Sequence, residues 1–372
     1  MSRLTSEQLN QLKAEYNVDR IWSWSRLNTF VEQPWVYYMT YLHPEKVKTD
    51  NVYSYWGTIS HDLVQSVYDN THSWKELPTL FDDSILEWRI SYSDMYKFPS
   101  ENIEKSYINN LNHYFQNFEK LPFEIENELP IKIVIDRNGA GKIVFIGYID
   151  SIYHTEDGHC YILDYKTSSI SGFTGKQLLE HSKQLLLYAI GVHQLTGLPY
   201  DKIHPRFDML KYVQIDYLQK NGKWKSTIKE RIKIVESQKK KIQKLLEDAG
   251  YDPIETEEMI QRAINENSFD SLPPVVTEKF KVSNAYIDVP FDEKIISDLE
   301  EWIIHHVEDC ERKEKGDLKS EFPQPRLDEN GNEFYFKVLA PQLLHYLDDY
   351  IDRSIANDLD DFEYDSLDDL FK

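Results

Sequence analysis

Two acidic residues and a lysine stand at strand-like spacing near the middle of this 372-residue chain. Asp150 ends one apolar run, and Asp164 and Lys166 lie two positions apart in the next. Because side chains at i and i+2 of a strand share a face, Asp164 and Lys166 should point the same way. Carboxylates inside an apolar fold are costly unless a cation compensates them, and oxygen ligands suit Mg²⁺ or Mn²⁺. The pattern therefore predicts a divalent-metal site.

The turn between the two runs decides which residues face each other. A two-residue loop at 157–158 would place Asp150 opposite Tyr165. A three-residue loop over 156–158, with its glycine at positive φ, would instead place Asp150 opposite Asp164. We predict this second register, in which opposed Cβ atoms lie about 4.5–5.5 Å apart, close enough for both carboxylates to bind one cation.

Lys166 adds a positive charge on the same face. It could orient or help deprotonate water and stabilise the negative charge that develops during attack on a phosphate. Two acids, a lysine and a metal ion together suit phosphodiester hydrolysis. The alternative is a buried Asp–Lys ion pair with a structural role only.

The surrounding sequence indicates the elements that position these residues. The first 120 residues are mainly helical in pattern, and Ser25 is the expected N-cap of a helix over 26–42 that Pro34 interrupts or restarts. Alternating residues from 123 onward then predict strands. We expect helices at 5–16, 57–70, 101–119, 176–196, 234–267, 291–315 and 338–351, and strands at 123–135, 142–153, 161–167 and 207–217. A three-strand meander, a helix and a further strand indicate an α+β or mixed α/β fold with a helical N-terminal region.

These patterns suggest five segments. They are a mainly helical N-terminal part over 1–120, a core over 121–217, a basic and helical insertion over 218–290, a C-terminal helical part that packs on the core over 291–356, and an acidic flexible tail over 357–372.

Charge is unevenly distributed along the chain. The total of 42 Lys+Arg against 64 Asp+Glu gives −22, which argues against general polyanion binding. Residues 202–244, however, hold thirteen basic residues against four acids, so nucleic acid stays possible as a ligand. No apolar run approaches the ~20 residues of a membrane span, and residues 1–20 lack a signal-peptide pattern. We expect a cytoplasmic protein that makes no contact with membranes.

Several sequence blocks resemble the RecB-type nucleases of the PD-(D/E)xK superfamily, in the order that the family has them. The blocks lie at 25–30 with 37–38, 57–61, 147–150, 164–167 and 184–189, followed by a later region at 280–291. The resemblance implies a restriction-endonuclease-like core, a mixed sheet with flanking helices, and metal-dependent cleavage of DNA.

The resemblance also implies roles for individual residues. Asp150 and Asp164 match the metal-binding acids, Lys166 the catalytic lysine, and His61 a further metal ligand from a helix. Taken alone, His61 could be an ordinary helix-face histidine.

Two further positions follow from the same resemblance. Gln184 and Tyr188, four residues apart on one helix face, match a pair beside the active site that holds the lysine or a phosphate; the alternative is a polar patch on a packed helix. Glu126 matches a further acid on the preceding strand, with Glu128 as the fallback.

Departures from the family pattern concern an iron–sulfur cluster. Relatives with that cluster use four cysteines, whereas this chain has Gln33 at the first of those positions and only Cys160 and Cys310 in total. We therefore expect no iron–sulfur cluster.

The basic segment and the tail suggest partners. DNA is expected along 202–244, with Lys220, Lys223 and Lys225 as contacts; Arg26 could touch a phosphate, although an exposed helix arginine is the simpler interpretation. The tail, which is acidic with Leu370 and Phe371 near its end, is similar to the acidic tips with which single-stranded-DNA-binding proteins recruit partners, or is a solubilising end.

We interpret the whole as a DNA exonuclease dependent on Mg²⁺ or Mn²⁺, acting in recombination, repair or replication. The alternatives are a structure-specific endonuclease on the same fold and a non-catalytic DNA-binding or scaffolding subunit that recruits a recombination or replication protein through its tail.

Overall fold

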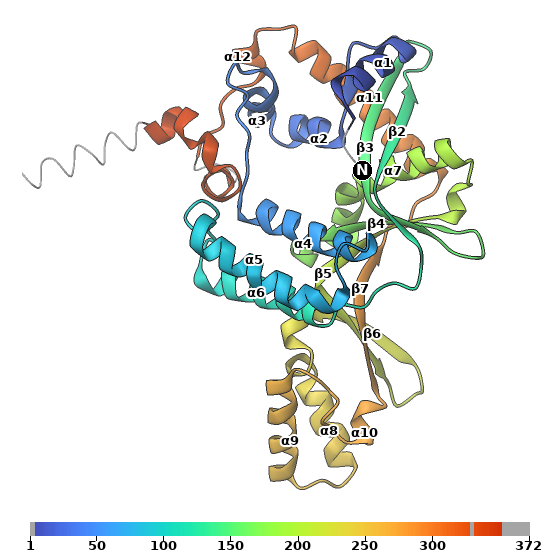
Figure 1. Ribbon diagram of the computed structural model, residues 1–372, viewed down its shortest axis with the longest axis vertical. Helices are drawn as coiled ribbons and strands as arrows, with labels where there is room; N and C mark the ends of the chain where they lie inside the picture. The colour runs from blue at the N-terminus through green and yellow to red at the C-terminus, as the bar shows by residue number, and fades with distance from the viewer. Residues whose placement is uncertain (1–3, 328–330, 352–372) are drawn as a thin grey trace, which may run out of the picture.

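A mixed seven-stranded sheet forms the centre of the computed structural model, which describes residues 4–327 and 331–351 (Figure 1). The strands run in the order β1-β3-β4-β5-β6, with β2 paired to β3 and β7 paired to β5. The pairs β1/β3 and β4/β5 are parallel and the others antiparallel. The strands are β1 (Ile21–Trp22), β2 (Ile125–Asp136), β3 (Lys142–His154), β4 (Cys160–Lys166), β5 (Ile203–Leu218), β6 (Trp224–Glu230) and β7 (Phe280–Asp288). The predicted mixed α/β class is confirmed.

The meander β2-β3-β4 has the predicted register. The Thr155 N–H donates to the His159 carbonyl, and Gly158 takes the positive φ of 80° that a three-residue loop requires. The ladder ends with the pair Ser151–Leu163, so Asp150 and Asp164 are the first residues beyond it, in the register that was predicted.

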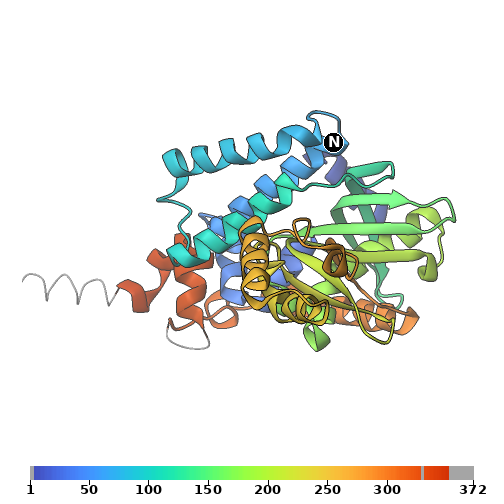
Figure 2. The same ribbon diagram turned by 90° about the horizontal axis from the view of Figure 1, so that it is seen from below.

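Helices cover both faces of the sheet, and the two faces form separate apolar clusters. On one face α7 (Gly175–Thr196) and α11 (Glu293–Lys313) pack with residues such as Ile133, Ile149 and Phe207. On the other, α4 (Val52–Tyr68), α5 (Leu77–Glu87) and α6 (Glu101–Gln116) pack around Tyr165 and Leu210. Figure 2 shows the blue and cyan helices above the green strands and the orange α11 below them.

A third cluster forms a lobe at the far end of β5 and β7. Its helices are α8 (Lys239–Asp248), α9 (Pro253–Glu266) and α10 (Pro274–Thr277), and Figure 1 shows them beyond the β5/β6/β7 end of the sheet. The single helix predicted over 234–267 is wrong, because Gly250, at φ 88°, ends one helix and Pro253 begins the next.

The N-terminal helices differ from the prediction in their starting points. Ser23, and not Ser25, caps α2 (Trp24–Glu32): its hydroxyl accepts from the Arg26 N–H. Pro34 then begins α3 (Pro34–Tyr37), which continues as a π-helical turn over Tyr38–Leu42. Proline lacks an N–H donor and fits the first position of a helix, so the chain restarts there.

The C-terminal segment packs on α3, although its local structure is not the helix predicted over 338–351. It forms a π-helical turn (Tyr335–Leu339) and a 3₁₀ turn (Pro341–Tyr346), and only residues 348–351 of the predicted range are α-helical. Phe336 meets Trp35 edge to face at 5.6 Å. The remaining helices are α1 (Ser6–Tyr16), α12 (Leu318–Glu321), α13 (Asn332–Phe334) and short 3₁₀ or π turns at Trp74–Glu76, Trp88–Tyr92, Ile170–Phe173, Tyr200–Lys202, Arg231–Lys233 and Glu236–Gln238.

Two further observations concern location and partners. Across residues 4–327 and 331–351, the helices are too short or too polar to cross a membrane. The acidic tail predicted over 357–372 lies outside the described residues.

Candidate active site

Side chains from two strands and two helices meet just beyond the point where the hydrogen-bonded pairing of β3 with β4 ends. Asp150 comes from β3, Asp164 and Lys166 from β4, His61 from α4, and the pair Gln184 and Tyr188 from α7. The alternation of β4 sends Asp164 and Lys166 to one face, while the intervening Tyr165 packs into the cluster beneath α4–α6.

Asp164 is buried, and its partner is Lys166. The carboxylate is 5% exposed, and its Oδ2 lies 2.5 Å from the Lys166 Nζ. Burial alone would lower the pKa of Lys166, but the charges of Asp164 and Asp150 outweigh it and raise this pKa above its usual value. Lys166 is therefore an ammonium ion at neutral pH.

The structure disfavours the charged form of the Asp150 carboxylate. Its pKa is raised from 3.8 to about 6, first by burial and then by the charge of Asp164, although His61, Lys166 and a main-chain bond oppose the rise. That bond comes from the Tyr165 N–H, 3.2 Å from the Asp150 Oδ2.

His61 bridges α4 and the strands with both ring nitrogens. Its Nε2 lies 2.8 Å from the Tyr165 carbonyl oxygen, which only accepts, so Nε2 must carry the proton. In the neutral ring this leaves the lone pair on Nδ1, which lies 3.4 Å from the Asp150 Oδ2. A histidine whose outer nitrogen donates to a carbonyl has the orientation and tautomer typical of a metal ligand.

Tyr188 and Gln184 form a hydrogen-bonded pair on α7. The Gln184 Nε2 donates to the Tyr188 hydroxyl at 2.9 Å. Burial, above all, raises the pKa of Tyr188 to about 12, and the charges of Asp150 and Asp164 contribute, so the ring lies close to both acids. A Cβ on Gly147 would stand 2.4 Å from Cε1 of this ring, so glycine is needed at that position of β3.

This donor set fits a divalent cation that keeps several water ligands. Asp150 Oδ2 and His61 Nδ1 lie 3.4 Å apart. Asp164 Oδ2 makes an ion pair with Lys166, but it accepts no hydrogen bond from the described part of the chain. Within residues 4–327 and 331–351 no three His, Cys, Asp or Glu side chains converge on one point, and Asp164 is paired with Lys166. Mg²⁺ needs only one or two protein carboxylates together with water and substrate phosphate.

Glu126 and Glu128 occupy different places relative to this cluster. Glu126 is exposed and pairs with Ile152. After the larger effect of burial, its charge contributes to the raised pKa of Cys160, at the turn end of the hairpin. Glu128 is half-buried and unpaired in the ladder: it lies between the pairs Asn127–Ser151 and Leu129–Ile149, level with Asp150, and adopts a left-handed φ of 48°. Such a conformation costs a residue other than glycine about 1–3 kcal/mol and is typical of functional sites.

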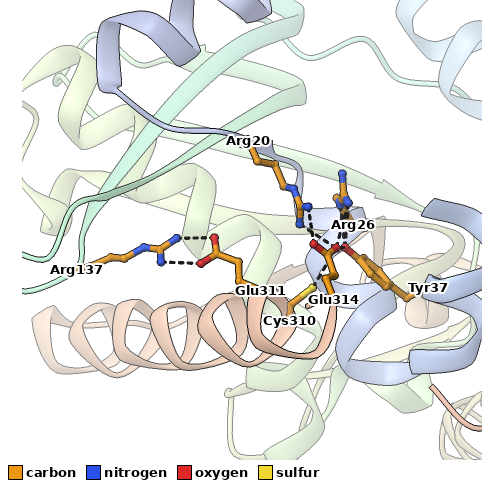
Figure 3. A network of polar contacts seen from close by, with 7 residues as sticks. All are labelled: Arg20, Arg26, Tyr37, Arg137, Cys310, Glu311 and Glu314. Atoms are coloured by element: carbon orange, nitrogen blue, oxygen red, sulfur yellow. Dashed lines mark hydrogen bonds and ion pairs between the residues drawn. The ribbon is translucent and has the colours of Figure 1, made fainter. Parts of the chain in front are cut away.

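Arg26 belongs to a separate network at the end of α11. Its guanidinium donates to the Tyr37 hydroxyl, which donates at 2.5 Å to Glu314. Arg20 binds both oxygens of Glu314, and Arg137 binds Glu311 in the same two-pronged way (Figure 3). These bonds connect α2, α3 and β1 to α11, so Arg26 has a packing role in this structure.

The three lysines predicted to contact DNA lie far from the acids. Lys220 and Lys223 are in the β5–β6 turn, and Lys225 is on β6. Lys166 pairs with Met209, and β5 runs nine residues further to Leu218, which corresponds to ~30 Å. The structure therefore does not bring these lysines to the cluster.

Main-chain groups of Tyr165 contribute to the site in a way that the sequence could not reveal. Its N–H binds Asp150 and its carbonyl binds His61. The one feature of the sequence that relates Tyr165 to the site is its position between Asp164 and Lys166, and not the chemistry of its side chain.

One buried and one half-buried carboxylate, a charged lysine and a histidine lie together on the central strands β3 and β4 and on α4, a set of groups suited to metal-dependent phosphodiester hydrolysis. A family model for the PD-(D/E)XK nuclease superfamily matches residues 21–293, a range that includes the whole cluster. The chain belongs to this superfamily, whose membership indicates nuclease activity and whose members generally use divalent metals such as Mg²⁺. A comparison with curated proteins found no match.

Proposed function

We propose that this protein is a RecB-type DNA exonuclease that hydrolyses phosphodiester bonds with Mg²⁺ or Mn²⁺. The observation that carries the proposal is the pairing of Asp164 with Lys166 beside the pairing of Asp150 with His61. Four groups suited to one reaction meet there from three elements, α4, β3 and β4.

Asp150, Asp164 and the Nδ1 of His61 are the groups that would hold the metal ion. Of the two glutamates proposed as a further acid, Glu128 is the nearer candidate, because it lies between the ladder pairs that flank Asp150, whereas Glu126 pairs with Ile152. A divalent cation supplies Lewis acidity and lowers the pKa of water.

Lys166 serves to bind and stabilise negative charge. Because the acids raise its pKa, it is an ammonium donor and not a base at neutral pH. It can therefore donate to a phosphate oxygen whose charge grows during in-line attack.

Tyr188 and Gln184 orient the substrate. The tyrosine keeps its proton at neutral pH, since its pKa is about 12, and its hydroxyl accepts from Gln184. The O–H of Tyr188 is then available to donate to a phosphate oxygen or to an acid of the cluster.

DNA beyond the cleaved bond would follow the basic segment 202–244. Lys225 and Lys229 lie close enough to Lys241 for their charges to lower its pKa, after the larger effect of burial. Such a positive cluster favours the phosphate backbone. A role in recombination, repair or replication, with a protein partner at the acidic tail, completes the proposal.

The test is digestion of end-labelled and circular DNA, single- and double-stranded, with Mg²⁺, Mn²⁺ or EDTA. We expect metal-dependent release from ends, no cutting of circles, and loss of cleavage with retained DNA binding in Lys166→Ala. Cutting of circles would favour a structure-specific endonuclease. If no DNA were cut with either metal, the protein would be a scaffold and the proposal would be wrong.

A further inference from the structure

A pocket of about 910 Å³ opens directly beside Lys166. Its walls come from the end of β4 with Ser168 and Ser169, from α4 and α6, and from the C-terminal segment around Phe334. The roles assigned above to the acids, His61, Gln184 and Tyr188 do not use this space. Anything bound in it would lie next to the phosphate at Lys166.

Lys211 supplies the pocket with a positive charge. Its ammonium lies 4.1 Å from the centre of the Tyr107 ring. Among the described residues its side chain has neither a hydrogen bond nor an ion pair within 4.0 Å, and Glu230 acts on it only at longer range. Burial lowers the pKa of Lys211 to about 8. A partly buried ammonium without a close counter-charge is costly, and an anionic ligand would relieve that cost.

Aromatic rings supply the pocket with flat apolar surface. Tyr53 is half-buried on α4 and packs at 5.7 Å from Tyr107. Phe334 on α13 is 53% exposed, unusually high for a phenylalanine. Nucleobases stack on such rings regardless of sequence, and a lysine near them takes the adjoining phosphate.

We propose that this pocket receives one unpaired nucleotide of the DNA strand, adjacent to the phosphate at Lys166, with its base against Tyr53 and Phe334 and its own phosphate at Lys211. The inference rests on the proposed function and adds a substrate class to it, single-stranded DNA. A base in a duplex is already stacked and paired, and it could enter a recessed pocket only by leaving the helix.

The experiment measures binding without turnover, so that it does not depend on cleavage. Fluorescein-labelled (dT)₁₂ and a 12-base-pair duplex are titrated in EDTA with the wild type, Lys211→Met, Tyr53→Leu and Phe334→Ser. Lys142→Met is the matched control, because Lys142 also lies over a tyrosine ring, at 5.3 Å from Tyr16, but at the start of β3, eight residues before Asp150. Phe334 is exposed, so its substitution should leave folding intact, and unfolding temperatures check this for each variant.

We expect each pocket variant to weaken (dT)₁₂ binding about tenfold, equivalent to ~1.4 kcal/mol. Duplex binding and the control variant should stay at wild-type levels. For Lys211→Met, the slope of log Kd against log salt should also fall by about 0.7, the share of one single-strand phosphate.

Wild-type binding of (dT)₁₂ by the folded pocket variants would overturn the inference, even if the enzyme cleaves DNA as proposed. Equal weakening of duplex binding would also overturn it. If thymidine monophosphate bound as tightly as (dT)₁₂ and responded equally to the substitutions, the pocket would hold a free nucleotide and the assignment to a strand would be wrong. A protein that cuts no DNA yet shows the expected binding would refute the proposed function alone.

Discussion

Replacing Asp150 by asparagine should stabilise the metal-free fold at neutral pH while removing its activity. Folding raises the pKa of Asp150 from 3.8 to about 6, because burial and the charge of Asp164 disfavour the carboxylate. A shift of about two units corresponds to ~3 kcal/mol. This is the free energy by which ionised Asp150 destabilises the fold above pH ~6.

The sign follows from proton binding. The folded state binds the Asp150 proton more tightly than the unfolded state, so this group's stabilisation is complete below pH ~4 and is lost as pH rises through 6. Asparagine has no such loss, but it gives up the interaction with His61, 3.4 Å away. We therefore expect a net gain of about 1–2 kcal/mol at pH 7.5 and little difference near pH 4.

Thermal unfolding in EDTA at the two pH values measures this difference. About 1–2 kcal/mol should raise Tm by a few degrees in a chain of this size. Asp270→Asn is the control, because Asp270 is exposed in the α9–α10 loop and its replacement removes one negative charge without changing the site. If Asp150→Asn were no more stable than the wild type at pH 7.5, or if its gain persisted unchanged at pH 4, the assignment of unfavourable charge to Asp150 would be refuted.

Three further changes test other parts of the structure. His61→Ala should raise the Mg²⁺ concentration for half-maximal cleavage at least tenfold, measured by metal titration with exposed His154→Asn as the control; an unchanged requirement would remove His61 from the ligand set. Gly147→Ala should cost about 1–3 kcal/mol in urea unfolding and slow cleavage, because its Cβ would stand 2.4 Å from Tyr188; full stability would contradict this close approach. Glu314→Gln should lower stability by about 1–3 kcal/mol without changing the metal requirement, since Glu314 binds Arg20 and Tyr37 away from the site; exposed Glu308→Gln is its control, and a changed metal requirement would argue against separate roles.

The strand hairpin could be predicted because its information is local. The turn at 156–158 fixes the register by loop length and one glycine, and spacing of two residues assigns Asp164 and Lys166 to one face. The family resemblance, and not the spacing, placed Glu126 beside the acids with Glu128 as the fallback; in the structure Glu126 pairs with Ile152, and Glu128 lies level with Asp150 between two ladder pairs. The left-handed φ at Glu128 is a distortion imposed by the folded strand, and a pattern of alternating residues does not contain it.

Non-local features could not be predicted. The charged strand β6 (Trp224–Glu230) is exposed or half-buried throughout, so it lacks the apolar alternation that indicates a strand. The pocket beside Lys166 joins Tyr53, Lys211 and Phe334, which are far apart in sequence and meet only when α4, β5 and α13 are in place. Neither the burial of Lys211 nor the exposure of Phe334 has a signature in its neighbours along the chain.

The charges at the site explain why it would bind metal and phosphate together. The three neighbouring groups Asp150, Asp164 and Lys166, two carboxylates and one ammonium, carry one net negative charge at neutral pH in a largely buried place. With a divalent cation the cluster would carry one net positive charge, which is equally costly to bury, and a single phosphodiester would neutralise it. Neither the metal ion alone nor the phosphate alone would leave these groups with zero net charge. Metal and DNA should therefore each tighten the binding of the other, as linkage requires when two ligands share one unfavourable charge.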